Sequence, residues 1–264
     1  MKNTSPIGIF DSGIGGITIW QEIVNQLPYE NTLYLADNKN APYGIKTADE
    51  VLNYSIKNTE YLISKGVKLI VIACNTATTN SISKLRSKFP NIKFIGVEPA
   101  IKPAALNSKS KRVAVLATSS TLQSVEFHEA LKKQYMKNVE LTKIAGAGLV
   151  QLIEENKIDS PEMRDLLRLY THEMKQAKID QLVLGCTHYP YLKEQLQKLL
   201  PDKVKIIDSG EAVARQTKYI LESENKLNDQ NQIGTHSFYY NKPNGNIQYF
   251  VPNDQNCKLE YIDF

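Results

Sequence analysis

Leu69-Ile-Val-Ile-Ala-Cys74-Asn-Thr76 is a continuous apolar run that ends in a thiol, an amide and a hydroxyl group. A strand without alternating polar residues is buried on both faces, as in a parallel sheet that is covered by helices. The pattern returns in Leu182-Val-Leu-Gly-Cys186-Thr187, 112 positions later (186 minus 74). The two runs predict equivalent strands in two related halves of the chain.

Short apolar runs of this kind alternate with amphipathic helical patterns along most of the chain, which predicts βαβ units. His236–Tyr240 is compatible with one more strand, and Ile247–Val251 with either a strand or a short helix. The other strands that we expect are Ile7–Phe10, Thr32–Ala36, Leu69–Ala73, Lys93–Val97, Arg112–Ala117, Val139–Ile144, Gln181–Leu184 and Val204–Ile207.

A second pair of similar segments supports the division into halves. Gly8-Ile-Phe-Asp11-Ser12 and Val113-Ala-Val-Leu-Ala-Thr118 are both apolar runs that end in polar residues. We therefore expect an α/β fold with two pseudo-symmetric lobes, each a mainly parallel sheet flanked by helices, and an active site in the cleft between them. We expect residues 1–98 and 210–264 in the first α/β lobe and residues 99–209 in the second.

The overall composition excludes several classes of protein. Hydrophobic residues form 42% and charged residues 23% of the 264 residues, as in a globular enzyme and unlike a disordered chain. The net charge of +4 is spread along the chain without a nucleic-acid motif, so we expect no nucleic-acid partner. No apolar run reaches the ~18 residues of a membrane span, and the N-terminus lacks a signal-peptide pattern. Three cysteines are an odd number for a disulfide framework, which favours a cytoplasmic protein with reduced thiols.

Polar or reactive side chains follow most of the expected strands. Parallel-sheet enzymes bind ligands at the carboxyl ends of their strands, so these side chains are the candidates for a site. They are Asp11 and Ser12 after the first strand, Pro42, Tyr43 and Gly44 after the second, Cys74, Asn75 and Thr76 after the third, Thr121 after the fifth, and Cys186, Thr187 and His188 after the seventh.

The two strand-end cysteines are the most reactive of these groups. A lone cysteine is often only a small buried hydrophobe, and Cys257, which has no matching context, is interpreted in this way. Cys74 and Cys186 instead occupy equivalent positions, and each precedes a threonine at an expected helix start. A helix N-terminus favours negative charge and therefore the reactive thiolate.

Three kinds of chemistry could use such thiols. A disulfide redox pair is one, although such pairs usually lie close in sequence. Hydrolysis with one cysteine nucleophile and one histidine base is the second. Inversion at a carbon is the third, because one base removes a proton from one face while a conjugate acid delivers a proton to the other. The two groups exchange roles in the reverse direction, so a matched pair of thiols suits this reaction best.

Acidic and basic side chains near the thiols fit the same interpretation. Asp11 could orient Cys74 or accept its proton, and His188 could adjust Cys186 near neutral pH. Glu154 closes the helical pattern that begins at Leu149 and is a further candidate acid. Backbone N–H groups and hydroxyls at helix N-termini hold carboxylates well, so a substrate with two carboxylates could be bound at both ends.

The sequence lacks the motifs of common cofactors. Gly13-Ile14-Gly15-Gly16 does not have the spacing of the dinucleotide fingerprint, and we expect it to turn into a helix instead. The four histidines are scattered without the spacing of metal ligands, and no lysine lies in a context typical of a pyridoxal Schiff base. We therefore expect no cofactor and no metal.

Four motifs resemble the signatures of bacterial glutamate racemase, in the aspartate/glutamate racemase superfamily. They are GIFDSGIGG (8–16), APYG (41–44), ACNTAT (73–78) and LGCTHYP (184–190), and the similarity spans about residues 7 to 210. The resemblance implies two α/β lobes, no cofactor, and interconversion of L- and D-glutamate, an isomerase reaction that supplies D-glutamate for peptidoglycan synthesis in the cell wall. It also implies glutamate as the substrate, and we expect a homodimer.

The resemblance further assigns roles to individual residues. Cys74 and Cys186 match the pair that donates and accepts the proton, Asp11 matches the acidic partner of the first cysteine, and His188 matches the partner of the second. Glu154 resembles a further catalytic acid, with Glu155 beside it as the other candidate. The positions that match substrate contacts are Asp11, Ser12, Pro42, Tyr43, Gly44, Asn75, Thr76, Thr121, Thr187 and His188.

The chain departs from the family pattern at two positions. Ser120 stands where the family usually carries glycine, and Gln151 stands where a proline is common. The alternatives to glutamate racemisation are a racemase of another substrate such as aspartate, a cysteine-dependent hydrolase that uses one thiol, and a pair of binding lobes without catalysis. The last would leave the paired strand-end cysteines unexplained.

Overall fold

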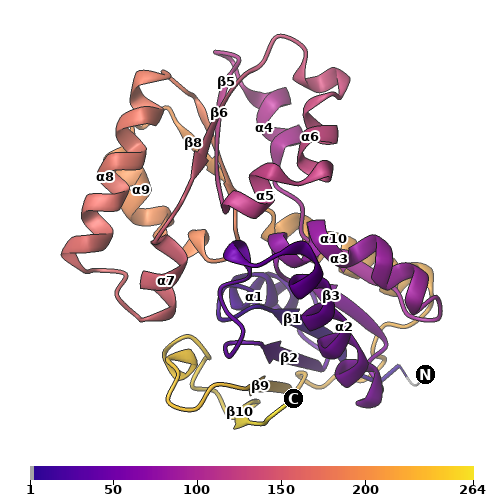
Figure 1. Ribbon diagram of the computed structural model, residues 1–264. Helices are drawn as coiled ribbons and strands as arrows, with labels where there is room; N and C mark the ends of the chain where they lie inside the picture. The colour runs from indigo at the N-terminus through magenta and orange to yellow at the C-terminus, as the bar shows by residue number, and fades with distance from the viewer. Residues whose placement is uncertain (1–2) are drawn as a thin grey trace. The chain divides into compact units, whose positions relative to one another are not determined.

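The computed structural model describes residues 3–264, so residues 1 and 2 of the expected first lobe lie outside the described part of the chain. The chain forms two units. One consists of the described residues up to Val97 together with Gly210–Phe264, and the other consists of Glu98–Ser209. Each unit contains one parallel sheet with helices packed on it (Figure 1). The predicted α/β class with two mainly parallel sheets is therefore confirmed.

The sheet of the first unit has six strands, all parallel to their neighbours, in the order β10-β9-β2-β1-β3-β4. Its strands are β1 (Ile7–Asp11), β2 (Thr32–Ala36), β3 (Leu69–Ile72), β4 (Phe94–Gly96), β9 (His236–Tyr240) and β10 (Cys257–Tyr261). Its helices are α1 (Ile17–Gln26), α2 (Ala48–Ser64), α3 (Asn75–Lys88) and α10 (Gly210–Ser223), with short 3-10 helices η1 (Tyr43–Ile45) and η4 (Ile247–Tyr249).

The sheet of the second unit has four parallel strands in the order β6-β5-β7-β8. Its strands are β5 (Arg112–Ala117), β6 (Glu140–Ala145), β7 (Gln181–Gly185) and β8 (Lys205–Ile207). Its helices are α4 (Ile101–Asn107), α5 (Ser119–Gln123), α6 (Val125–Leu131), α7 (Leu149–Glu154), α8 (Pro161–Gln176) and α9 (Lys193–Leu199), with short 3-10 helices η2 (Gln134–Met136) and η3 (Tyr189–Leu192).

The two sheets repeat one strand order. The order β2-β1-β3-β4 within the first sheet corresponds to β6-β5-β7-β8 in the second, so β1 is equivalent to β5 and β3 to β7. These are the two pairs of segments that resemble each other in sequence. The pseudo-symmetry predicted from those segments is therefore present in the strand order.

Both faces of the central strands of the first sheet are buried, which explains their continuous apolar sequences. Phe10, Ile70 and Ile72 share a core with residues of α2 and α3, which pack against each other. Ile9 and Val71, at the alternating positions, are fully buried on the other face. The helices α1 and α10 pack against each other, and a ring of α1 contacts a ring of β9. The sheet is thus the middle layer of three, as is usual for parallel sheets.

The second sheet is covered in the same way. Val113, Val115 and Ala117 of β5 share a core with residues of α4, α5 and α6. The helices α8 and α9 pack together on the other side of the strands (Figure 1). Met163 and Leu167, on the apolar face of α8, are fully buried. The apolar residues that recur with helical spacing along α8 thus form the face that covers this sheet.

The C-terminal segment adds two strands to the first sheet. β9 forms at His236–Tyr240, as expected, whereas β10 at Cys257–Tyr261 was not expected from the sequence. Its sequence CKLEY alternates apolar and charged residues, because an edge strand is only half-buried. The ambiguous segment Ile247–Val251 forms the short helix η4. Among residues 3–264, no helix combines the length and the apolar character needed to cross a membrane.

A buried ion pair anchors the start of β3 to two loops. The Lys68 ammonium contacts the Glu30 carboxylate, and both side chains are almost fully buried. It also donates hydrogen bonds to the carbonyl oxygens of Asn3 at 2.7 Å and Lys226 at 2.9 Å. Glu30 in turn accepts a hydrogen bond from the backbone of Asn228 at 2.8 Å.

Replacing Lys68 with alanine should therefore lower the free energy of unfolding by about 3–5 kcal/mol, because it leaves a buried carboxylate without its counter-ion. Urea unfolding followed by circular dichroism measures this quantity. Lys198→Ala, which removes an exposed pair with Glu194, is the control and should leave the unfolding midpoint in place. Equal midpoints for Lys68→Ala and the unmodified protein would show that the buried pair does not stabilise the fold.

Candidate functional site

The carboxyl edge of the first sheet gathers the candidate residues of the first unit. β1 and β3 are adjacent and parallel, with Phe10 opposite Ile72, so Asp11, Ser12 and Cys74 emerge at the same edge. The thiol of Cys74 lies 3.9 Å from the Ser12 hydroxyl. The Ser12 hydroxyl donates to Asp11 Oδ1 at 3.4 Å. The structure therefore brings together the thiol and the acid that the sequence predicts as partners.

Cys74 lies at the N-terminus of an α-helix, as expected. It is the N-cap residue of α3, and its sulfur accepts a hydrogen bond from the backbone N–H of Ala77 at 3.4 Å. The N-terminal turn of a helix carries partial positive charge, which favours negative charge on the sulfur. Only 5% of Cys74 is exposed, so little bulk water competes with this contact.

Asp11 is held by the start of α1. Its Oδ2 accepts a hydrogen bond from the backbone N–H of Gly16 at 2.7 Å, and Asp11 is fully buried. A Cβ atom at position 16 would lie 2.7 Å from the Cβ atom of Asp11 and 2.8 Å from the Tyr34 hydroxyl. Only glycine permits this approach. The expected turn of the Gly13–Gly16 segment into a helix is confirmed by α1, whereas the role of Gly16 in holding the acid was not predicted.

Asn75 and Thr76 directly follow Cys74 in the sequence. They lie in the first turn of α3, and both are buried. The side-chain amide of Asn75 donates to the Val97 carbonyl at 3.3 Å. This bond fixes Asn75 within the first unit, next to the end of β4. Both residues thus lie at the sheet edge at which the sequence places them.

The expected contact loop Pro42-Tyr43-Gly44 begins the short helix η1 after β2, and the Ala41–Pro42 peptide bond is cis. Tyr43 is buried, and its hydroxyl donates to the Asp37 carboxylate at 2.5 Å. Burial and the nearby negative charges of Asp37 and Cys74 raise the pKa of the Tyr43 hydroxyl well above its usual value. The phenol therefore remains protonated and acts as a hydrogen-bond donor.

In the second unit, three predicted residues form a chain of contacts. Cys186 follows β7, and its sulfur lies 3.9 Å from Nδ1 of His188. Nε2 of the same ring lies 2.6 Å from Oε1 of Glu154, at the end of α7. Cys186 and His188 are buried. Of the two adjacent glutamates, Glu154 is thus the one that contacts His188, whereas Glu155 pairs with Lys157.

This chain of contacts alters the protonation of the imidazole. Burial alone lowers the pKa of His188, but its contacts with Cys186 and Glu154 outweigh burial and raise the pKa well above its usual value. The ring thus carries its proton at neutral pH and stands between two groups that bear or can bear negative charge. A proton-bearing imidazole beside a sulfur can stabilise a thiolate or return a proton to it.

The expected helix start after Cys186 is wrong. A turn and the short 3-10 helix η3 follow this residue, and α9 begins only at Lys193. Pro190 lies at the start of η3 and lacks a backbone N–H, which limits hydrogen bonding in that turn. Cys186 is therefore placed beside an imidazole rather than at the N-terminus of an α-helix.

Thr187 and Thr121 are also buried in the second unit. Thr121 lies in α5, where its backbone N–H and its hydroxyl both bond to the hydroxyl of Thr118, the N-cap residue. Ser120 lies within the same helix and has no left-handed backbone conformation that would demand glycine. Gln151, the other departure, is exposed on α7 and donates to Glu155 at 3.1 Å.

Cys257 lies apart from both groups of residues in the sequence and in the strand order. It begins the edge strand β10, in register with His236. Burial raises the pKa of the Cys257 thiol, and the charge of Asp254 adds to this shift. A raised pKa keeps the thiol protonated and unreactive, in line with the structural interpretation.

The predicted residues thus form two groups, each at the carboxyl edge of one sheet. One group contains Asp11, Ser12, Pro42, Tyr43, Gly44, Cys74, Asn75 and Thr76, and the other contains Thr121, Glu154, Cys186, Thr187 and His188. Within residues 3–264, no three His, Cys, Asp or Glu side chains are grouped so that they could hold a metal ion. A single chain does not test the expected homodimer, which stays a prediction.

Asp37, which accepts the Tyr43 hydrogen bond, was not among the predicted site residues. Asp37 directly follows the buried strand β2, so the rule that selected the other strand ends could also have found it. Asn241, which contacts Asp37 from the far end of the chain, follows the expected strand His236–Tyr240, so the same rule could have selected it, although nothing in its local sequence relates it to residue 37.

Known proteins match the chain over most of its length. The family model for Asp/Glu/Hydantoin racemase matches residues 8–217. A glutamate racemase of Ectopseudomonas mendocina is 42% identical over 220 residues, covering 83% of both chains. A glutamate racemase of Clostridium acetobutylicum is 42% identical over 234 residues, covering 89% of this chain and 90% of the relative.

Solved structures of similar proteins also match the chain over most of its length. A glutamate racemase from Bacillus anthracis superposes with a TM-score of 0.84 at 30% identity, covering 99% of this chain and 98% of the other. The Escherichia coli glutamate racemase, solved with L-glutamate and the activator UDP-MurNAc-Ala, gives the same TM-score and identity over 98% of both chains. A family match over most of the length, with relatives above 40% identity, shows that this chain belongs to the Asp/Glu/Hydantoin racemase family of isomerases.

Proposed function

We propose that the chain interconverts L-glutamate and D-glutamate by proton transfer at the α-carbon, with Cys74 and Cys186 as the two acid–base groups. The observation that carries this proposal is the repeat of one arrangement in two sheets. The equivalent strands β3 and β7 are each followed by a buried thiol, and each thiol lies beside groups that can carry a proton or a negative charge.

In the proposed mechanism, one sulfur is a thiolate and the other a thiol. The thiolate removes the α-proton, the electron pair of the C–H bond passes toward the substrate carboxylate, and the second thiol delivers its proton to the opposite face of the carbon. The reverse reaction exchanges these roles, which two identical side chains allow. The two thiols supply both proton transfers, so the proposed reaction needs no cofactor.

The surroundings of each sulfur support these roles. The α3 N-terminus and the Asp11–Ser12 pair hold Cys74, while His188 and Glu154 hold Cys186. The negative charge that develops on the substrate carboxylate requires hydrogen-bond donors. We assign this task to the buried polar residues Ser12, Asn75, Thr76, Thr121 and Thr187, together with the Pro42-Tyr43-Gly44 loop.

The choice of glutamate as substrate rests on the relatives. The similar curated proteins are glutamate racemases, and two of the similar structures were solved with L-glutamate or D-glutamate. We further propose that the D-glutamate formed is used in peptidoglycan synthesis in the cytoplasm, where a reducing environment keeps both thiols free. Loss of the circular dichroism signal of L-glutamate, with no added cofactor, tests the activity. Activity on L-aspartate alone would contradict the choice of substrate.

A cysteine hydrolase remains a second candidate because of one observation. The contacts Cys186–His188–Glu154 join a thiol, an imidazole and a carboxyl group in one series, the set of groups that cysteine hydrolases use. This reaction would use one thiol and form an acyl-enzyme intermediate, which mass spectrometry could detect. It would leave the placement of Cys74 at a helix N-terminus without a purpose, and for this reason we favour racemisation.

Replacing either Cys74 or Cys186 with serine should lower the rate of racemisation by about 100- to 10,000-fold, because one face of the α-carbon loses its acid–base group. Circular dichroism of L- and D-glutamate measures the rates. Each single variant should still exchange the α-proton of one enantiomer with deuterated water, which NMR detects, because one thiol remains. Cys257→Ser is the matched control and should racemise at the unmodified rate. Full two-way racemisation by either active-site variant excludes the two-thiol mechanism.

The raised pKa of His188 predicts a pH-dependent contribution of Glu154 to stability. Since the folded protein holds this proton more tightly than the unfolded chain, the contribution is fully present below the unfolded pKa of about 6.5 and is lost as pH rises through the folded pKa. Glu154→Gln should therefore destabilise the protein more at pH 6 than at pH 10. Urea unfolding at both values measures the difference.

The neighbouring residue provides the control for this experiment. Glu155 is exposed and does not contact His188, so Glu155→Gln should show no such change with pH. A destabilisation by Glu154→Gln that is equal at pH 6 and pH 10 would mean that a charged imidazole does not stabilise the folded state.

A further inference from the structure

Asn241 is a buried polar residue that lies outside the part of the chain matched by the family model, which ends at residue 217. It directly follows β9, one of the two strands near the C-terminus in Figure 1, and only 1% of it is exposed. Because β9 pairs in parallel with β2, Asn241 emerges at the same sheet edge as the loop that follows β2.

Both functional groups of Asn241 bind that loop. Its side-chain N–H donates to Asp37 Oδ1 at 2.6 Å. Its side-chain oxygen accepts from the backbone N–H of Lys39 at 2.9 Å. One side chain thus fixes two positions of a loop that lies about 200 residues away in the sequence, and its hydrogen bond to Asp37 is buried.

Asp37 links Asn241 to the end of β1 and to Tyr43. Its backbone N–H donates to the carbonyl oxygen of Asp11 at 3.0 Å, and its Oδ2 accepts the hydroxyl of Tyr43 at 2.5 Å. Its other oxygen accepts from the Asn40 side chain at 2.8 Å as well as from Asn241. Asp37 therefore joins three strand ends at one edge of the sheet. Its backbone N–H binds the end of β1, and its carboxylate binds residues that follow β2 and β9.

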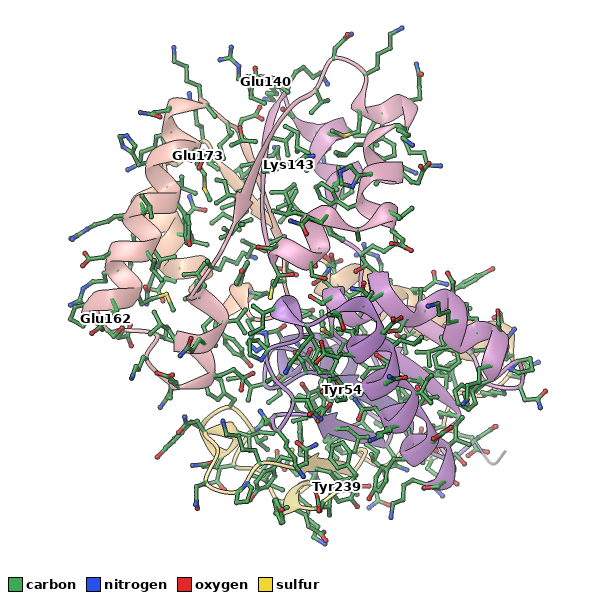
Figure 2. The ribbon with its side chains drawn as sticks, in the orientation of Figure 1. Tyr54, Glu140, Lys143, Glu162, Glu173 and Tyr239 are labelled. Carbon is green, nitrogen blue, oxygen red and sulfur yellow. The ribbon has the colours of Figure 1, made fainter. Side chains whose placement is uncertain are left out.

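Tyr43 is held on its ring as well as on its hydroxyl. Its ring stacks on Tyr54 of α2, labelled in Figure 2, with centroids 5.6 Å apart and an angle of 28° between the planes. Asn58 of the same helix donates to the Tyr43 hydroxyl at 3.2 Å. The ring contacts fix where Tyr43 lies, and the bond to Asp37 fixes the hydroxyl and the backbone of the 42–44 loop behind it.

We propose that Asn241 is a positioning residue of this racemase, acting through Asp37 to hold Tyr43 and the 42–44 loop in place for the substrate. The inference rests on the proposed function, in which that loop binds glutamate. Asn241 itself takes no part in proton transfer, and both of its polar groups are already used by Asp37 and Lys39. Its loss should therefore weaken substrate binding and leave the proton-transfer step largely intact.

Steady-state racemisation kinetics of four proteins test this inference. They are the unmodified protein, Asn241→Ala, Tyr43→Phe and the double variant. Asn241→Ala should lower kcat/KM about tenfold, mostly through a higher KM, because uniform binding is lost rather than transition-state stabilisation. In the Tyr43→Phe background, which lacks the hydroxyl, Asn241→Ala should have much less effect, because both changes break the same network.

Asn228→Ala is the matched control. Asn228 also belongs to the C-terminal segment, and its side chain donates to the Tyr29 carbonyl at 2.6 Å. Tyr29 precedes β2, so this bond lies at the opposite edge of the sheet from the candidate site. This variant should keep the unmodified KM even if its unfolding midpoint falls. Asn241→Asp, which preserves size and the bond from Lys39 but sets a second carboxylate against Asp37, should also raise KM and provides a second variant if the alanine protein does not fold.

The outcomes separate this inference from the proposed function. Unmodified protein that does not racemise glutamate overturns the function and the positioning role with it. Active unmodified protein, together with folded Asn241 variants of unchanged KM, overturns only the positioning role. Independent, multiplying effects of Asn241→Ala and Tyr43→Phe would also overturn it, since Asn241 would then act by a route other than the Tyr43 hydroxyl.

Discussion

The parallel pairing of strands buried on both faces is the constraint on which the rest of this structure depends. Apolar side chains occupy both surfaces of the central strands, so polar groups are largely confined to the ends of these strands. Parallel register then brings those ends to a single edge, as the pairing of Phe10 with Ile72 does for Asp11 and Cys74. The polar groups at the strand ends of each unit are therefore neighbours because backbone hydrogen bonds hold adjacent strands in parallel register.

This constraint also explains how much could be predicted from the sequence. Strands β2, β5 and β9 begin and end where the apolar runs indicate, and the equivalence of β3 and β7 follows from the repeat around the two cysteines. Local signals suffice for such strands, because burial of consecutive residues imposes a continuous apolar pattern. The same signals place Cys74 at the start of a helix, where its sulfur accepts a backbone N–H.

Contacts between distant segments left no local signal and could not be predicted. The edge strand β10 is half-buried, so its alternating sequence resembles a polar loop. Glu154 and Glu155 are equivalent in sequence, and only the turn of α7 decides that the first faces His188. Asn241 meets Asp37 across 204 positions, a contact that depends on the order of strands in the folded sheet. In each case, the missing information is the neighbour across the sheet or helix rather than the residue itself.

The two thiols have different electrostatic surroundings, although the strands that carry them are equivalent. Cys74 relies on the backbone N–H groups of a helix N-terminus and on a buried carboxylate that Gly16 alone allows to approach. Cys186 has no such helix and instead lies beside an imidazole whose proton is retained through Glu154. Backbone N–H groups at a helix N-terminus carry no titratable proton, whereas the imidazole does, so the surroundings of the two sulfurs differ in kind. The internal repeat thus places the two thiols at equivalent strand ends, while the groups around each sulfur differ.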